Sequence, residues 1–402
     1  MVAYMLSQCE KKNTQTGKMS RKMNRDIYIE IDDKKERSSR KTGIEALRII
    51  AILMVIYVHR VGHETLFSAQ QFSVSYYVLW FFEIVSYKAV DIFFIITGYF
   101  SVTQKKLRIK KIIGMEIKVA LYIMFFFILG VSLGLQTFSG RELLKGFFPY
   151  VGGAYWYYTA YVSLILLSPW INKFLSIITS KQHLMLILLI TLGSTLSLGD
   201  VFFTSDGYSV IWAINLYMIG AYIRLHIKKL PSVKSSILIS AGSTGFIFMW
   251  FVAVGRLTQI IFGREIFSTH FLVYRQLPVV VGAIFTVIAF LQIDIKGIAG
   301  KIIRQIAGCV FGIYLIHSCV FMDVLFWVRL FPASNFALNG WYWLYVLGTV
   351  FVMFFVCLVI ELIRNRVFRK IDNARWMGDL ADFIKKKVLN FVVNLHQRIG
   401  GE

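Results

Sequence analysis

The sequence predicts an all-α membrane protein, a bundle of about ten transmembrane helices with both termini in the cytoplasm. Of its 402 residues, 57% are hydrophobic and only 16% are charged, whereas soluble domains carry about 25% charged residues. The apolar residues form blocks of about twenty, the length that an α-helix needs to cross a bilayer. Such blocks recur from Ile44 to Ile363. Continuous apolar runs indicate helices, because only helices and closed barrels satisfy their backbone hydrogen bonds in lipid.

Ten such blocks are the predicted spans, and the second differs from the rest. It is the longest, and the charged residues Lys88 and Asp91 interrupt it. Because charged side chains are costly inside a bilayer, we expect this span to be tilted or to be broken near Ser86. The ten blocks cover residues 44–62, 74–100, 112–135, 155–175, 183–199, 209–225, 235–255, 273–292, 305–328 and 341–363.

The distribution of basic residues predicts the orientation of these spans. The loops on one side contain 14 Lys and Arg residues, the loops on the other side contain six, and both terminal segments are basic. Positively charged loops stay in the cytoplasm, so we expect both termini there, which requires an even number of spans. The formal charge of +22 then reflects topology and attraction to anionic lipids, and we expect no nucleic-acid partner.

The segments outside the spans are short and basic. Residues 1–43 are mostly polar and lack the apolar core of a signal peptide, so we predict a disordered cytoplasmic tail. Residues 44–365 form one predicted membrane domain. Residues 366–402 form a second cytoplasmic tail, in which apolar residues and lysines alternate as in an amphipathic helix on the inner membrane surface. The four cysteines show neither zinc-site spacing nor a disulfide framework.

The first predicted span carries two candidate functional residues on one face. Arg48 and His59 are eleven residues apart, which places both on one stripe of an α-helix, about 16 Å apart along its axis. The planar fork of an arginine suits phosphate or carbonyl oxygens, and a histidine is best placed to act as a general base near neutral pH. In the alternative interpretation, Arg48 pairs with Glu45 or extends to the interface, and His59 bonds to a carbonyl.

Two titratable residues follow His59 closely. Glu64 could orient the histidine and raise its basicity, as the carboxylate of a catalytic triad does; the alternative is a solvated loop residue. His59 and His63 also have the spacing of metal ligands on a helix. No second pair of ligands lies near them in the sequence, so we predict no metal site.

The second span and the loop after it supply further candidates. Asp91 lies in an apolar run and needs a partner, for which Lys88, three residues earlier, is the simplest choice. The basic run at residues 105–111 includes Arg108. This run is a sufficient topology signal, and it could also hold an anionic substrate at the membrane face.

Aromatic residues and one histidine complete the candidates. Trp156 and Tyr157 begin the fourth span within a cluster of aromatic residues. Such clusters usually form an interfacial belt, and the alternative is a platform on which sugar rings stack. His317 is a lone histidine in an apolar run, where packing between helices and a chemical role are equally open.

Four of these segments together resemble the family-3 membrane acyltransferases. Arg48 and His59 reproduce the Arg-x10-His signature of that family's first helix. Residues 90–100 are similar to its V-D-x-F-F-x-x-S-G-[YF] motif, with Thr97 where serine is usual. Residues 156–170 and 312–317 resemble two further blocks, and the likeness extends from about residue 43 to 365.

The resemblance implies a multi-pass enzyme of the bacterial plasma (inner) membrane. It implies an acyl-CoA donor, usually acetyl-CoA, on the cytoplasmic side and an acceptor hydroxyl on a cell-surface glycan. His59 would be the essential histidine, Arg48 the donor-contacting arginine, and Arg108 a basic residue that helps to bind the donor. The departure at Thr97 leaves a catalytic hydroxyl there unassigned.

Some members of that family carry a fused extracytoplasmic hydrolase-like domain. We expect this chain to act on an undecaprenyl-linked or nascent glycan, or with a separate extracytoplasmic transferase or polysaccharide synthesis protein. Two other functions are compatible with the charged residues within the spans. One is transport of a lipid-linked glycan, although the sequence lacks the repeated halves of many transporters. The other is a non-catalytic role in a polysaccharide synthesis complex.

Overall fold

The computed structural model describes residues 41–62, 68–104, 107–197, 199–333, 336–369, 376–384, 386, 387 and 390. Within these ranges all regular structure is helical and no strand occurs, which confirms the predicted all-α class. Most of both predicted tails lies outside the described residues. The short helical stretch at residues 376–384 buries Met377 and Ala381 and exposes Trp376 and Phe383.

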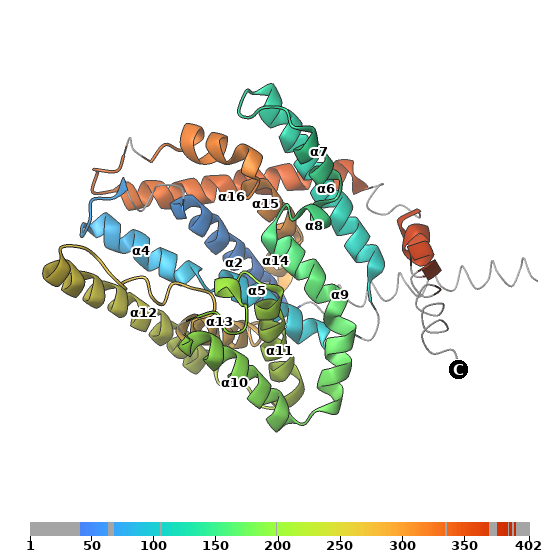
Figure 1. Ribbon diagram of the computed structural model, residues 1–402, viewed down its shortest axis with the longest axis horizontal. Helices are drawn as coiled ribbons and strands as arrows, with labels where there is room; N and C mark the ends of the chain where they lie inside the picture. Colours follow the sequence, from blue (N-terminus) through green and yellow to red (C-terminus); the bar gives the residue numbers. More distant parts are fainter. Residues whose placement is uncertain are drawn as a thin grey trace, which may run out of the picture.

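The helices pack side by side in a bundle, with α2 in its interior (Figure 1). This helix contacts α4, α5, α13, α14, α15 and α16, so its residues meet side chains from most of the bundle. The helices are α2 (Thr42–Arg60), α4 (Val74–Ser86), α5 (Ala89–Ser101), α6 (Ile109–Ser132), α7 (Gly140–Phe147), α8 (Pro149–Gly152), α9 (Trp156–Ile177), α10 (Ser180–Leu196), α11 (Val210–His226), α12 (Val233–Phe262), α13 (Leu277–Phe290), α14 (Gly297–Ala307), α15 (Val310–His317) and α16 (Tyr342–Val367), with shorter 3-10 turns at Ser205–Gly207 and Val320–Met322 and a π-helix at Val324–Leu330.

Each predicted span contains at least one helix, but two of the ten are broken. The second span divides into α4 and α5 beside Tyr87 and Lys88, as expected near Ser86. The prediction of one continuous helix over residues 305–328 is wrong. α14 and α15 meet there at a bend of 42°, and α15 ends at His317 before the 3-10 turn and the π-helix begin.

Five of the described helices are long and apolar enough to cross a membrane. They are α2, α6, α9, α12 and α16, and the bent pair of α14 and α15 adds a sixth if it forms one span. The protein is therefore a multi-pass membrane protein. Ten spans and two cytoplasmic termini stay predictions.

The tightest helix contact holds α5 against α11. A Cβ atom added to Gly98 would collide with the backbone of Tyr217, and one added to Gly220 would collide with the backbone of Ile95. Small residues allow membrane helices to approach this closely, and the resulting van der Waals contacts hold the helices together. The glycine after Thr97 thus fixes α5, one wall of the cavity described next, in the bundle.

Candidate active site

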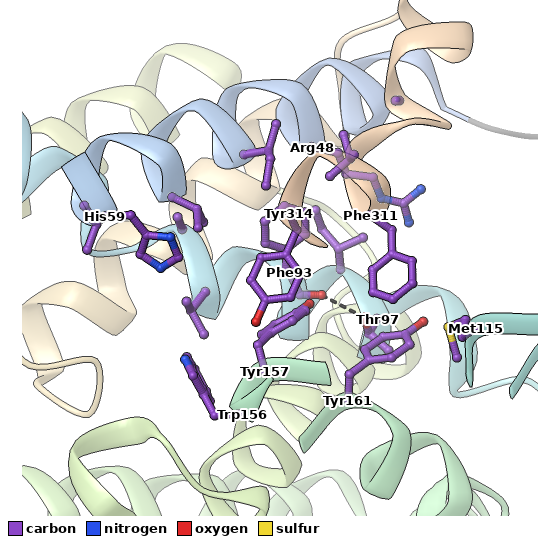
Figure 2. Close-up of a pocket in the computed structure, with 18 of the residues that line it drawn as sticks. Arg48, His59, Phe93, Thr97, Met115, Trp156, Tyr157, Tyr161, Phe311 and Tyr314 are labelled. Carbon is purple, nitrogen blue, oxygen red and sulfur yellow. Dashed lines mark hydrogen bonds between the residues drawn. The ribbon is translucent and has the colours of Figure 1, made fainter. Parts of the chain in front are cut away.

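A cavity of about 530 Å³ lies inside the bundle. Its walls come from α2, α5, α6, α9, α15 and α16, from the last residues of α4 and α14, and from the segments that precede α11 and α13. Figure 2 shows that His59 and Trp156 lie at one end of the cavity, whereas Arg48, Phe311 and Met115 lie at the other. We call these the His59 end and the Arg48 end.

Helix α2 lines the cavity along one stripe. Arg48, Ile52, Val55 and His59 all face it, and their spacing of three or four residues is that of one helical face. The structure thus places the two residues of the Arg-x10-His signature on one wall, separated by two apolar side chains.

Basic residues from three helices line the cavity: Arg48, Lys111, Lys118 and Arg364. None of the described lining residues is acidic. Lys111 donates to the hydroxyl of Tyr161, 3.3 Å away, and Nζ of Lys118 lies 5.5 Å from the centre of the Phe311 ring. Because Tyr161 and Phe311 both lie toward Arg48 (Figure 2), the positive charge gathers at the Arg48 end.

Carboxylates behind the wall hold two of these cations. Nη1 of Arg48 bonds to Oε1 of Glu45 at 2.9 Å, so the predicted alternative pair is present. It engages only one edge of the guanidinium, whose side chain keeps 31% of its surface exposed. Lys118 forms an ion pair with the buried Glu361, which also accepts a hydrogen bond of 2.6 Å from Tyr122.

A second cavity of about 180 Å³ adjoins the Arg48 end. Arg48, Thr97, Lys111 and Tyr161 line both cavities, and Arg108 lines the second. The structure therefore brings Arg108 close to Arg48, although sixty residues separate them in the chain. Lys105 and Lys106, from the same basic run, lie outside the described residues.

The hydroxyl of Thr97 donates to the carbonyl of Phe93 at 2.8 Å, within its own helix (Figure 2). This bond is the usual one for a threonine inside a helix. The hydroxyl of Thr97 is therefore bonded within its own helix, and we assign it no catalytic role.

At the His59 end, two residues lie beside His59: His317, the last residue of α15, and Ser318, the C-cap of that helix. Oγ of Ser318 lies 3.1 Å from Nδ1 of His59, and the rings of His59 and His317 are 5.1 Å apart between centroids. Nδ1 of His317 lies 2.6 Å from the carbonyl of Ile313, so this nitrogen carries the proton. His317 is fully buried behind the cavity wall.

The other predicted site residues divide into three groups. Glu64 and His63 lie outside the described residues. Trp156 and Tyr157 line the cavity. Asp91 lines neither cavity; it is fully buried at the contact between α5 and α11.

The expected pair between Lys88 and Asp91 is wrong. Oδ1 of Asp91 accepts a hydrogen bond of 3.3 Å from Nε1 of Trp212. Lys88 lies at the break between α4 and α5 and turns toward α12, where it donates to Ser240 at 3.2 Å and to Thr244 at 3.4 Å. The break separates the two side chains, which a continuous helix would have placed on one face.

A family model described as an acyltransferase domain, that of acyltransferase family 3, matches residues 41–362. The chain belongs to this family. No curated protein and no solved structure matches the chain.

The matched range includes all of the lining residues of the larger cavity except Arg364. Among the described residues, no group of three or more His, Cys, Asp or Glu side chains could hold a metal ion. The sequence interpretation missed Ser318, Lys118 and Arg364. Their only signal was a hydroxyl next to His317 and two cations within or beside predicted spans.

Proposed function

We propose that this membrane acyltransferase transfers an acyl group, in the first instance acetyl, from cytoplasmic acyl-CoA to a hydroxyl of a cell-surface or lipid-linked glycan. The observation that carries the proposal is the polarity of the cavity. It presents cations at one end and a histidine at the other, both open to the same space.

The cationic end suits the phosphates of a coenzyme A thioester. Arg48 and Lys111 line both cavities, and Arg108 extends the basic surface into the smaller one. Arginine forks bind phosphate oxygens through two hydrogen bonds at once. The larger cavity has no acidic residue among its described lining residues, and in the smaller one the carboxylate of Glu45 is paired with Arg48. We therefore place the nucleotide of the donor toward the smaller cavity.

The distance along α2 suits the arm of the donor. Arg48 and His59 are about 16 Å apart along the helix axis, a distance similar to the length of an extended pantetheine arm. The apolar side chains of Ile52 and Val55 lie between them. With its phosphates at Arg48, the donor therefore brings its thioester to His59.

The proposed chemistry at His59 is general base catalysis. In the tautomer whose Nδ1–H donates to Ser318, Nε2 carries the lone pair that accepts the proton of the acceptor hydroxyl. The hydroxyl oxygen then bonds to the thioester carbon and the C–S bond breaks. The CoA thiolate leaves and takes the proton from His59. The same base serves direct transfer and transfer through a covalent acyl-enzyme.

In this scheme Ser318 orients His59, which is the role that the sequence predicted for Glu64. A hydrogen bond to one ring nitrogen sets the tautomer and orientation of a histidine. The carboxylate of Glu64, five residues after His59, stays a predicted second contributor.

The proposal places the enzyme in the bacterial plasma membrane, with both termini and the Arg48 end on the cytoplasmic side. The acceptor glycan reaches the His59 end from the opposite side. It is presented as an undecaprenyl-linked or nascent chain, or a separate extracytoplasmic transferase or polysaccharide synthesis protein takes over the acyl group.

Mass spectrometry of surface glycans tests this function in cells that lack the gene and are complemented with wild type or His59→Ala. We expect base-labile acyl groups on the glycan with wild type only, at unchanged amounts of surface glycan. Acylation that persists with His59→Ala would favour a non-catalytic partner. Loss of surface glycan without the protein would favour a transporter.

A further inference from the structure

The His59 end of the cavity is enclosed by aromatic rings from separate parts of the chain. Trp156 begins α9, Tyr208 precedes α11, and Tyr274 precedes α13; all three line the cavity. The ring centroids of Trp156 and Tyr208 are 4.6 Å apart, those of Tyr208 and Tyr274 are 5.0 Å apart, and those of Trp156 and Tyr274 are 6.3 Å apart. These three rings form what we call the aromatic box.

All three rings of the box line the cavity, but they differ in exposure: Tyr208 is 47% exposed, whereas Trp156 is partly buried and Tyr274 is buried, unlike a residue of an interfacial belt. A belt residue exposes its ring to the lipid headgroups. Tyr274 is only 5% exposed, and its ring is packed between Tyr208 and Tyr87, whose centroid lies 5.2 Å away. Trp156 points into the same end of the cavity as His59 (Figure 2).

An ion pair joins the two loops that carry the tyrosines. Nε of Arg275 donates to Oδ1 of Asp206 at 3.0 Å, and Thr195 donates to the carbonyl of Arg275 at 3.0 Å. Tyr274 directly precedes Arg275, and Tyr208 lies two residues after Asp206. The ion pair therefore links the two loops close to both tyrosines.

The loop before Tyr208 has an unusual backbone that its own hydrogen bonds stabilise. Phe203, Ser205 and Asp206 all have positive φ angles, which cost non-glycine residues free energy and persist only where the surroundings enforce them. The carboxylate of Asp200 accepts hydrogen bonds from the backbone and hydroxyl of Thr204, at 2.7 and 2.6 Å, and from the backbone of Ser205 at 2.5 Å. These hydrogen bonds fix the backbone at Thr204 and Ser205, shortly before Tyr208.

We propose that Trp156, Tyr208 and Tyr274 form the acceptor subsite, in which a pyranose ring stacks so that one of its hydroxyls lies at His59. The inference rests on the proposed function and assigns its acceptor end. A pyranose has apolar C–H faces and a rim of hydroxyls, and tyrosine and tryptophan combine an apolar face with a polar edge. The Asp206–Arg275 pair positions the two tyrosines without touching the sugar.

The test uses the full-length protein in membranes of its source cells that lack the wild-type gene, with the endogenous glycan as acceptor and radiolabelled acetyl-CoA as donor. Two products are measured, acetyl groups on the glycan and free acetate from hydrolysis. Binding of acetyl-CoA to each purified variant shows that the protein is folded and that the donor end is intact.

We expect Tyr208→Ala and Tyr274→Ala each to lower transfer to the glycan about five- to tenfold, the scale of losing one aromatic contact. Donor binding and acetate release should stay within about twofold of wild type, an allowance for context-dependent packing. The corresponding phenylalanine variants should retain most of the transfer, because the ring persists. Tyr222→Ala is the matched control, because Tyr222 lies on α11 and contacts His183 and His226, and it lines neither cavity.

Two results would overturn the subsite. One is wild-type transfer in both alanine variants. The other is a loss of donor binding that matches the loss of transfer, which would assign the rings to the donor. A wild-type protein that places no acetyl on the glycan while it binds acetyl-CoA would contradict the proposed acceptor class itself, so the two failures are distinguishable.

The ion pair gives a second, independent readout. Asp206→Asn keeps the size of the side chain and removes the charge that Arg275 meets. We expect an increase in KM for the glycan of about threefold, as for a partly exposed charged pair, with kcat unchanged. An unchanged KM would contradict the positioning role of this pair.

Discussion

The two ends of the cavity are built in different ways. The Arg48 end takes its cations from long, regular helices, α2, α6 and α16, and carboxylates behind the wall hold two of them. The His59 end takes its groups from places where helices begin or stop: Trp156 at the start of α9, Ser318 at the end of α15, and Tyr208 and Tyr274 in connecting segments. In the proposed function, regular helices place the fixed charges that would bind the donor, and helix ends and connecting segments shape the end that would meet the acceptor.

This difference implies that the two ends can be damaged separately. A change at the Arg48 end should weaken binding of acyl-CoA and spare the chemical step. A change at the His59 end should slow transfer and spare donor binding. The predictions below test this separation.

The largest effect is expected for His59→Ala. Loss of a general base lowers the rate of acyl transfer by about 10²–10⁴-fold, while the Kd for acetyl-CoA stays near that of wild type. Steady-state transfer and isothermal titration calorimetry measure the two quantities. His270→Ala, at an exposed histidine outside both cavities, should behave as wild type. Substantial transfer by His59→Ala would move the chemistry elsewhere, with His317 the next residue to test.

Arg48→Lys should change the Kd for acetyl-CoA rather than the rate of the chemical step. Lysine keeps the charge but cannot meet two oxygens through a planar fork, so we expect the Kd for acetyl-CoA to rise about tenfold, the equivalent of 1.4 kcal/mol. Glu45→Gln is the matched variant, because it removes only the partner seen at 2.9 Å. Normal binding by the lysine variant would show that Arg48 needs only its charge. Poor expression of both variants would show a structural pair.

A smaller effect is expected for Ser318→Ala. It removes one hydrogen bond to His59, and a typical net contribution of about 1 kcal/mol corresponds to roughly a fivefold decrease in kcat. The Kd for acetyl-CoA should not change. An unchanged kcat would show that other groups orient His59. The kcat of Glu64→Gln would then test whether Glu64 is one of them.

Reporter insertions test whether the two ends of the cavity face opposite sides of the membrane. If the two ends face opposite sides of the membrane, a reporter at Asp206 should be extracytoplasmic and one at Lys229 cytoplasmic. Alkaline phosphatase and green fluorescent protein activities distinguish the two locations. Both reporters on one side would contradict the ten-span topology.

The Arg48 end was predictable in part from the sequence, which indicated Arg48 and the basic run of Lys111 but neither Lys118 nor Arg364. A fixed charge in an apolar run is conspicuous, and helical periodicity relates it to His59 without knowledge of the fold. Arg108 was indicated by the basic run after the second span, although only the fold shows that it lies near Arg48, in the lining of the same small cavity.

The His59 end was less predictable, because its groups lie next to helix breaks. The break beside Lys88 turned that side chain to α12, and so the expected partner of Asp91 was wrong. Because α15 ends at His317, Ser318 lies within hydrogen-bond distance of His59. The predicted continuous helix over residues 305–328 did not indicate this contact. Tyr208 and Tyr274 carry no sequence signal that separates them from the chain's other 18 tyrosines; only tertiary packing brings them together.

The most direct test of the account asks where the acyl group lies when the donor is bound. A coenzyme A thioester with a short, photoreactive acyl chain is irradiated with the purified protein, and the cross-linked peptides are identified by mass spectrometry. Excess acetyl-CoA should prevent the labelling. We predict label on the residues His59, Trp156 or Ser318, located within each peptide by fragmentation. Label confined to Lys118, Phe311 or Arg364 would place the acyl group at the Arg48 end and contradict the account.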